Sequence, residues 1–132
     1  MRYLLDTNTC IAYLNGRSES VKNRLLSSEG EDLFLCSVVK AELTYGAMKS
    51  QRVETNMAKL HTFFDYFVSL PFGDREAEKY GEIRSVLEGQ GKIIGPNDLM
   101  IASIASANDM ILVTNNTKEF QRVEGLRIED WL

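Results

Sequence analysis

Three carboxylates in this sequence stand where apolar segments end or begin. Asp6 follows the apolar run 2–5, and Glu42 lies about one helical turn beyond the run 32–37. Asp98 opens an apolar segment with helical spacing. Because ligands of open parallel sheets bind beyond the carboxyl ends of the strands, we expect these carboxylates to meet at one edge of a sheet.

Other oxygen-bearing side chains accompany the acids and define the chemistry that this edge could support. Asn115 and Asn116 follow the apolar run 110–114. Carboxylate, amide and hydroxyl oxygens suit hard cations such as Mg²⁺ and Mn²⁺. The single histidine and the two widely separated cysteines argue against a zinc site. Like charges held together without a cation raise one another's pKa, so the cluster favours a bound magnesium or manganese ion.

Taken singly, each acid also has a structural interpretation. Asp6, followed by Thr7 and Asn8, could form a turn or cap a helix, and Asp98 could cap the helix that it opens. Glu42 alone reads as an exposed helix residue. The metal interpretation rests on all three acids meeting at one edge, where Asp98 could serve as both cap and ligand.

Short continuous apolar runs alternate with helical segments, which is typical of an α/β sandwich around a mainly parallel sheet. The expected strands cover residues 2–5, 32–37, 67–72, 110–114 and 126–128. The expected helices cover residues 9–14, 19–28, 38–49, 52–67, 74–88 with Asp74 as a cap, and 98–108. No linker or repeat interrupts this pattern, so residues 1–132 are predicted to form a single domain.

The composition is that of a globular protein with a small negative charge. The chain carries 15 Lys and Arg against 19 Asp and Glu, and the formal charge of −4 argues against nonspecific coating of nucleic acid. No apolar run approaches the roughly 20 residues that span a bilayer, and the first residues do not read as a signal peptide. Both cysteines lie in apolar segments, so we expect a cytoplasmic protein with no membrane association.

Four motifs, in order along the chain, resemble those of the PIN-domain ribonucleases and most closely those of the VapC toxins of bacterial toxin–antitoxin pairs. They are LLDTN (4–8), KAELTYGA (40–47), GPNDLMIASIA (95–105) and ILVTNNTKEFQRVEGLRIEDW (111–131). No single motif is decisive, but their order over the whole chain makes the resemblance specific. It implies a PIN-like α/β/α sandwich with a central, mainly parallel sheet.

By this resemblance Asp6, Glu42 and Asp98 are the catalytic acids, with Asp6 and Asp98 as metal ligands. The family often has a fourth acid at the position of Asn116, so Glu119 could supply the missing charge. The sequence leaves open whether one metal ion or two would bind.

The resemblance also implies groups around the acids. Thr114 and Asn8 are expected to act as hydrogen-bonding auxiliaries. Basic side chains on neighbouring helices could form a rim that contacts RNA, or a salt-bridged helix surface; they are Lys40, Lys49, Arg75, Lys79, Arg84 and Lys92.

The function implied is that of a Mg²⁺- or Mn²⁺-dependent endoribonuclease, the toxin of a type II toxin–antitoxin pair. Relatives often cut transfer RNA, notably the initiator, and thereby block translation and growth. The implied partner is a VapB-type antitoxin, whose C-terminal arm covers the groove and often places an arginine among the acids. A homodimer is also implied, with the helical apolar surface of residues 52–67 as a candidate interface.

Two other functions are compatible with the residues. The absence of an acid at Asn116 could leave a PIN-like module that binds RNA or protein without cutting. Asp6 could alternatively be the nucleophile of a phosphatase, although Asn8 then replaces the second acid of the D-x-D-x-T motif that such enzymes resembling the haloacid dehalogenases carry. Metal-dependent RNA cleavage separates these functions from a nuclease, and a trapped aspartyl-phosphate at Asp6 would identify the phosphatase.

Overall fold

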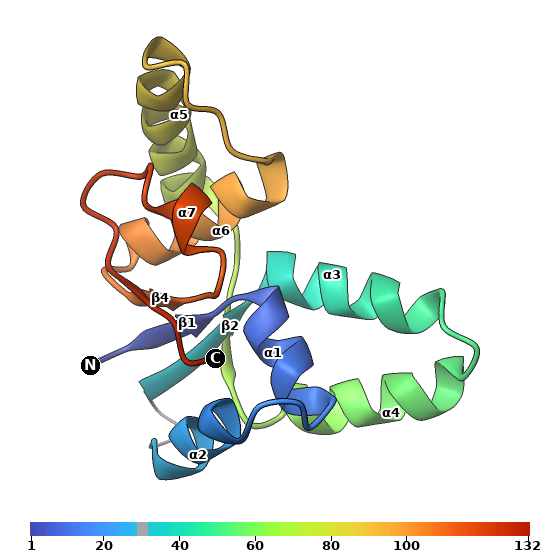
Figure 1. Cartoon of the computed structure of the whole chain (residues 1–132). Helices are drawn as coiled ribbons and strands as arrows, with labels where there is room; N and C mark the ends of the chain where they lie inside the picture. Colours follow the sequence, from blue (N-terminus) through green and yellow to red (C-terminus); the bar gives the residue numbers. More distant parts are fainter. Residues whose placement is uncertain (29–31) are drawn as a thin grey trace.

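A computed structural model describes residues 1–28 and 32–132 of the chain, and it contains a parallel sheet with helices on both faces (Figure 1). Within the described residues the strands form one five-stranded sheet in the order β3-β2-β1-β4-β5, and each neighbouring pair is parallel. The predicted α/β sandwich is therefore confirmed. The strands are β1 (Tyr3–Leu5), β2 (Leu33–Cys36), β3 (Val68–Leu70), β4 (Ile111–Val113) and β5 (Ile128–Glu129).

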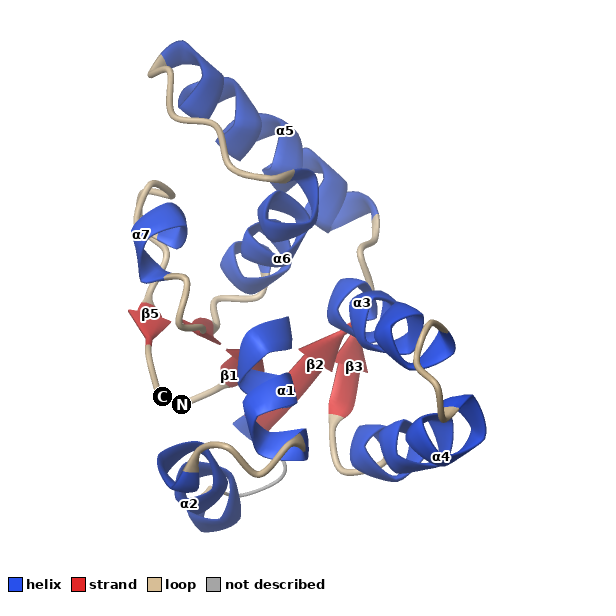
Figure 2. Ribbon diagram, turned by 45° about the vertical axis from the view of Figure 1, so that its right-hand side comes forward, coloured by secondary structure: helices blue, strands red, loops and turns tan. Residues whose placement is uncertain are grey.

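The helices fall into two groups that follow the chain order. Right-handed crossovers place the helices before β3 on one face of the sheet and the helices after it on the other. Figure 2 shows α1, α2 and α4 lying across the strands from α5 and α6. The helices are α1 (Thr7–Leu14), α2 (Glu19–Ser27), α3 (Ser37–Met48), α4 (Val53–Phe64), α5 (Asp74–Gly89), α6 (Pro96–Ala107) and α7 (Thr117–Phe120).

The core lies at β1, the central strand, and at its neighbour β4. Leu4 and Leu5 of β1 are fully buried, and every residue of β4 is buried. Strands covered by helices on both faces have no polar side, which explains why their sequences are continuous apolar runs. Strand β3 forms one edge of the sheet, and its Val68 is exposed.

The chain leaves β1 and β4 in opposite directions. After β1 it passes through α1 towards β2, and after β4 it passes through α7 towards β5. A parallel sheet opens a crevice at such a switch point, beyond the carboxyl ends of the two strands. Asp6 and Thr114 are the residues that directly follow these strands.

Two expected helix caps are wrong, and the reason is local. Helix α5 has Gly73 as its N-cap, so Asp74 is its first residue and not its cap. Helix α6 starts at Pro96, whose fixed φ suits the first helical position and whose missing N–H is not needed there. Asp98 therefore lies inside the first turn of α6.

Both cysteines lie in the core, as their apolar segments predicted. Among the described residues Cys10 and Cys36 are both free and buried. No helix of the described residues is long and apolar enough to cross a membrane.

A buried glutamate joins α5 to α6, the helix that carries Asp98. Oε1 of Glu76 accepts a hydrogen bond from the backbone N–H of Gly73 at 3.1 Å, and Oε2 accepts from Nδ2 of Asn108 at 3.2 Å.

We expect Glu76→Ala to lower the free energy of unfolding by about 1–3 kcal/mol, because both donors lose their acceptor. Urea unfolding measures this free energy. The matched control is Glu78→Ala, an exposed change on the same helix, whose free energy of unfolding should stay within about 0.5 kcal/mol of that of the parent. Equal effects of the two substitutions would contradict the link.

Candidate active site

Asp6 is a buried carboxylate at the carboxyl end of the central strand β1. It is 4% exposed and forms the N-cap of α1. Oδ1 accepts a hydrogen bond from the backbone N–H of Thr7 at 2.8 Å, and Oδ2 accepts from the hydroxyl of Thr114 at 2.7 Å. Burial raises the pKa of Asp6, while these two hydrogen bonds lower it in part. Asp6 therefore caps α1 through Oδ1, as one interpretation of the sequence expected. Its other oxygen, Oδ2, faces Thr114 instead of the helix.

Thr114 connects three segments that end at this edge of the sheet. Its side chain is fully buried, and its hydroxyl accepts a hydrogen bond from the backbone N–H of Asn116 at 3.0 Å. Its own backbone N–H donates to the carbonyl of Glu129 in β5 at 2.9 Å. Thr114 thus fixes Asp6 on one side and the start of the loop after β4 on the other.

Glu42 reaches the same edge from the second turn of α3. Its Oε1 and the hydroxyl of Thr7 are buried, and neither has a hydrogen-bond partner among the described residues. Burial raises the pKa of Glu42, the side chains of Thr7 and Asn97 beside it lower the pKa in part, and the negative charge of Asp6 raises it further. A buried oxygen without a partner carries a desolvation cost, which a bound cation would offset.

Asp98 does not cap α6, contrary to the expectation from the sequence. The N-cap is Gly95, and no side chain makes a capping hydrogen bond there. Oδ2 of Asp98 instead accepts a long hydrogen bond of 3.4 Å from Nδ2 of Asn116. The same nitrogen donates to Oε2 of Glu119 at 3.0 Å, so the amide bridges the two carboxylates.

The acids are close enough to perturb one another. Burial, followed by the negative charge of Asp6 and by the charges of Glu119 and Glu42, raises the pKa of Asp98 to about 7. Like charges in a partly desolvated site favour the protonated form, whereas a cation would favour the carboxylate. Asp98 is therefore the acid whose charge depends most directly on what binds beside it.

Asn8 and Asn115 form the exposed border of this group. Nδ2 of Asn8 lies 3.5 Å from Oδ1 of Asn115, so the structure pairs Asn8 with another amide and not with an acid. Asn115 follows the same strand as Thr114, and this position is the sequence signal that identifies it as a neighbour of the site.

The residues fit a hard cation by their chemistry, although they do not enclose one as they are placed. Their donor set consists of oxygens, which Mg²⁺ and Mn²⁺ prefer, and it includes the unpartnered Oε1 of Glu42. Within the described part of the chain, no three His, Cys, Asp or Glu side chains are grouped tightly enough to hold an ion. The Asn116 amide lies between Asp98 and Glu119 and donates to one oxygen of each, so the two carboxylates are held side by side.

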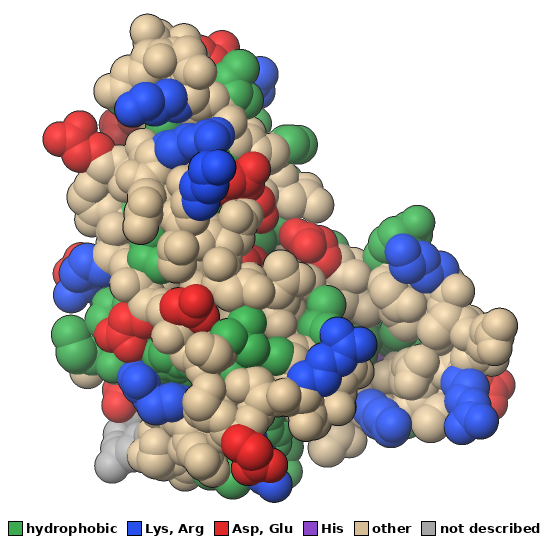
Figure 3. Space-filling view, in the orientation of Figure 1, with side chains coloured by type: hydrophobic (Ala, Val, Ile, Leu, Met, Phe, Trp, Pro, Cys, Tyr) green, Lys and Arg blue, Asp and Glu red, His purple; other side chains and the backbone are tan. Residues whose placement is uncertain are grey.

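The surface around these elements has two lobes. In Figure 3 one lobe lies over α5 and the other over α3 and α4, with acidic side chains in the angle between them and Lys and Arg on both. Two of the predicted rim residues belong to a salt-bridged helix surface. Lys79 pairs with Glu82 at 3.5 Å, and Arg84 pairs with Glu88 at 2.7 Å.

The fold and the acids at its switch point define a family. The family model described as PIN domain matches residues 3–126, and the chain belongs to this family, as the motifs predicted. The chain is 43% identical over 132 residues to Ribonuclease VapC2 of Rickettsia felis, covering 99% of this chain and 98% of the relative. It is 42% identical over 131 residues to the tRNA(fMet)-specific endonuclease VapC of Shigella flexneri, with the same coverage.

A solved structure agrees along the full chain. A chain in the crystal structure of VapBC2 from Rickettsia felis, bound to a DNA fragment from their promoter, superposes with a TM-score of 0.93. The two chains are 42% identical, and the match covers 100% of each. The fold and family predictions are thus both confirmed.

The raised pKa of Asp98 makes stability depend on pH in a defined direction. In the unfolded chain an aspartate loses its proton near pH 3.9, whereas folded Asp98 keeps it until about pH 7. Without divalent ions, the parent protein should therefore lose stability relative to Asp98→Asn as the pH rises from about 4 to 7. We expect a relative loss of about 1 kcal/mol, because solvent screens this partly exposed group.

Urea unfolding at pH 4.5 and pH 8, with chelator present, measures this difference. Asp65→Asn, an exposed change at the end of α4, is the matched control. If the difference in the free energy of unfolding between the parent and Asp98→Asn is the same at both pH values, the electrostatic account is contradicted.

Proposed function

We propose that this chain is a divalent-metal-dependent endoribonuclease and the toxin of a toxin–antitoxin pair. The single observation that carries the proposal is the group of carboxylates at the β1–β4 switch point, with buried Asp6 fixed by Thr114 and with Glu42 Oε1 unpartnered. The ribonuclease names of the full-length relatives support the same reaction class.

The proposed metal ligands are Asp6 and Asp98, with Glu42 as the third catalytic acid. When bound, a divalent cation lowers the pKa of water and offsets the negative charge that develops on a phosphodiester. Asp6 would contribute a ligand whose orientation is already fixed by two hydrogen bonds. Above its pKa of about 7, Asp98 would contribute its carboxylate without giving up a proton.

Asn116 and Glu119 would together replace the fourth acid of the family. The amide is neutral, but its hydrogen bond of 3.0 Å holds the Glu119 carboxylate beside Asp98. The Glu119 carboxylate would therefore supply a charged oxygen one helical turn beyond position 116, where the family often has its fourth acid. Asn8 and Asn115 border the acids on the exposed side, where amide groups could hydrogen-bond an RNA strand.

Hydrolysis without a covalent enzyme intermediate is the chemistry that these groups support. Neither cysteine is suited to act as a nucleophile, because burial raises the pKa of Cys36 to about 11 and that of Cys10 well above its ordinary value. A phosphatase with Asp6 as its nucleophile would carry a second acid two residues further on, where this chain has Asn8.

The proposed substrate is transfer RNA, and the initiator is the first species to test. The Shigella flexneri relative is named a tRNA(fMet)-specific endonuclease. The Lys and Arg side chains on both lobes of the face in Figure 3 could contact phosphates while the acids lie between them. Because transfer RNA works in translation, the proposed site of action is the cytoplasm.

The proposed partner is a VapB-type antitoxin. Beside Glu42 lies a cavity of about 230 Å³ between α1, α3 and α4, lined in part by Ile11, Leu14, Leu43 and Leu60. This arrangement suits a partner segment that places apolar side chains in the cavity and a guanidinium against the acids. Homodimerisation stays a prediction. Within the candidate interface of residues 52–67, Phe63 is buried in the core of the single chain, so its ring is not available to a second copy.

Cleavage of a transfer-RNA pool by the purified chain, free of antitoxin, tests the function. With Mg²⁺ or Mn²⁺ we expect discrete fragments, and none with chelator or with Asp98→Asn, which removes a ligand charge at nearly unchanged volume. Loss of at least about 100-fold in rate is expected, and Asp65→Asn should cleave like the parent.

Full activity of folded Asp98→Asn, or fragments that persist with chelator, would contradict the metal-dependent mechanism. Intact RNA in every lane, with Mn²⁺ bound normally, would favour the binding module that the neutral Asn116 suggests.

A further inference from the structure

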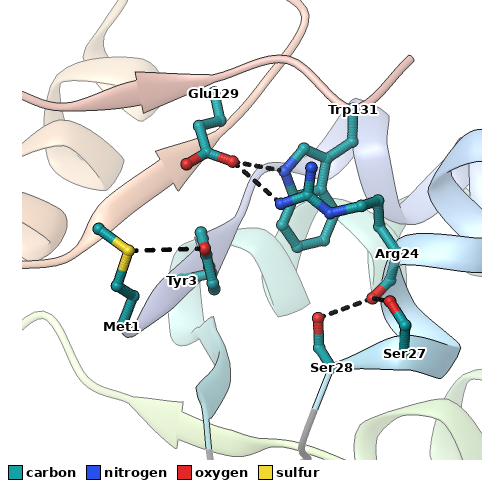
Figure 4. Close-up of polar contacts among 7 residues, drawn as sticks. All are labelled: Met1, Tyr3, Arg24, Ser27, Ser28, Glu129 and Trp131. Carbon is teal, nitrogen blue, oxygen red and sulfur yellow. Dashed lines mark hydrogen bonds and ion pairs between the residues drawn. The ribbon is translucent and has the colours of Figure 1, made fainter.

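A second set of polar contacts lies where the last residues of the chain meet α2 (Figure 4). The Trp131 cluster consists of Trp131, Arg24, Glu129 and Tyr3. Trp131 is 4% exposed, and the guanidinium of Arg24 lies over its ring, 4.5 Å from the centroid. Nη2 of Arg24 and Nε1 of Trp131 donate to the same atom, Oε1 of Glu129, at 3.1 and 3.0 Å.

Two further contacts hold the tryptophan in place. The ring of Tyr3 meets the ring of Trp131 edge to face, with 5.2 Å between the centroids and 63° between the planes. The hydroxyl of Ser20, at the start of α2, donates to the backbone carbonyl of Trp131. The cluster therefore joins α2, β1 and the residues after β5.

The cluster bears on the site through the backbone of Glu129. The side chain of this residue is the shared acceptor of the cluster, while its carbonyl accepts the backbone N–H of Thr114 at 2.9 Å. Thr114 in turn donates to Oδ2 of Asp6 and accepts from Asn116. Two residues thus separate Arg24 from the Asp6 carboxylate.

Strand β5 needs such an anchor. It has two residues in the ladder, it lies at the edge of the sheet, and both of its residues are only partly buried. Short edge strands fray when nothing else holds them. If β5 moved away, the buried N–H of Thr114 would lose its acceptor, and the hydroxyl that fixes Asp6 would lose its position.

We propose that Arg24, through its contacts with Trp131 and Glu129, is a positioning residue for the active site that sets the orientation of Thr114 and thereby of Asp6. Within the described part of the chain, the side chain of Arg24 contacts Trp131 and Glu129 and not Thr114 or Asp6. Its effect on the site is to keep the Asp6 oxygen in place before a cation binds. This inference rests on the proposed function, because the geometry that it protects is that of the proposed metal ligand.

The chain provides a matched control on α5. Arg84 also lies over an aromatic ring, with its guanidinium carbon 6.0 Å from the centroid of Tyr80, and it also pairs with a glutamate, Glu88, at 2.7 Å. This second trio is confined to one helix, and among the residues that the structure describes its hydrogen bonds do not reach Thr114 or Asp6. Arg84→Ala therefore removes a similar set of contacts without the connection to the site.

Calorimetric titration with Mn²⁺ in the absence of RNA, together with amide hydrogen exchange, tests the proposal on the full chain. For Arg24→Ala we expect Mn²⁺ affinity to fall about three- to tenfold, below the range for direct partners of metal ligands. Exchange of the Thr114 and Asn116 amides should accelerate about tenfold. Arg84→Ala should change neither quantity, and Arg24→Lys, which keeps the cation, should restore part of the affinity.

The outcomes separate the two proposals. Folded Arg24→Ala that binds Mn²⁺ as tightly as Arg84→Ala would overturn the positioning role, whether or not exchange at Thr114 is faster. If Arg24→Ala fails to fold, Arg24→Met replaces it, because it keeps an apolar side chain over Trp131 while removing the cation and the donors to Glu129, and unchanged affinity would again overturn the role. A parent protein that binds no Mn²⁺ contradicts the proposed function instead, and exchange at Thr114 then tests the connection alone.

Discussion

The hydrogen bond between the Thr114 hydroxyl and Oδ2 of Asp6 determines how the candidate site is built. A carboxylate that is 4% exposed is expensive to ionise unless hydrogen bonds or a cation stabilise its charge. Asp6 receives one bond from the start of α1 and one from the residue after β4, so its position follows from the pairing of β1 with β4. Every other acid of the site is arranged around a group that the sheet itself holds in place.

The neighbouring acids are held less firmly, and the difference has a physical cause. Asp6 and Thr114 follow adjacent parallel strands, whereas Glu42 and Asp98 come from the second turn of α3 and the first turn of α6. Glu42 has an unpartnered oxygen, and Asp98 has one long hydrogen bond to Asn116. The site therefore combines one fixed carboxylate with others that can adjust, which suits the proposed binding of an ion and then of RNA.

The alternation of apolar runs predicted the parallel sheet because buried strands need side chains of one kind on both faces. The same argument predicted that Asp6, Glu42 and Asp98 would gather at one edge. The pattern of apolar runs could not predict that Asp98 fails to cap α6. The helix starts at Pro96, with Gly95 as its N-cap, which is two residues before Asp98. Nor could the sequence reveal the amide bridge of Asn116 or the contacts of Arg24 with Trp131, because both depend on where distant segments pack.

The most direct test of a cation site among these acids is the number of protons released when Mn²⁺ binds. Calorimetry in two buffers with different ionisation enthalpies gives this number at each pH. With the pKa of Asp98 at about 7, we expect release close to one proton per ion at pH 6 and close to none above about pH 8.5. Binding that releases no proton at either pH would place the ion away from Asp98, and the absence of binding at both would contradict the site itself.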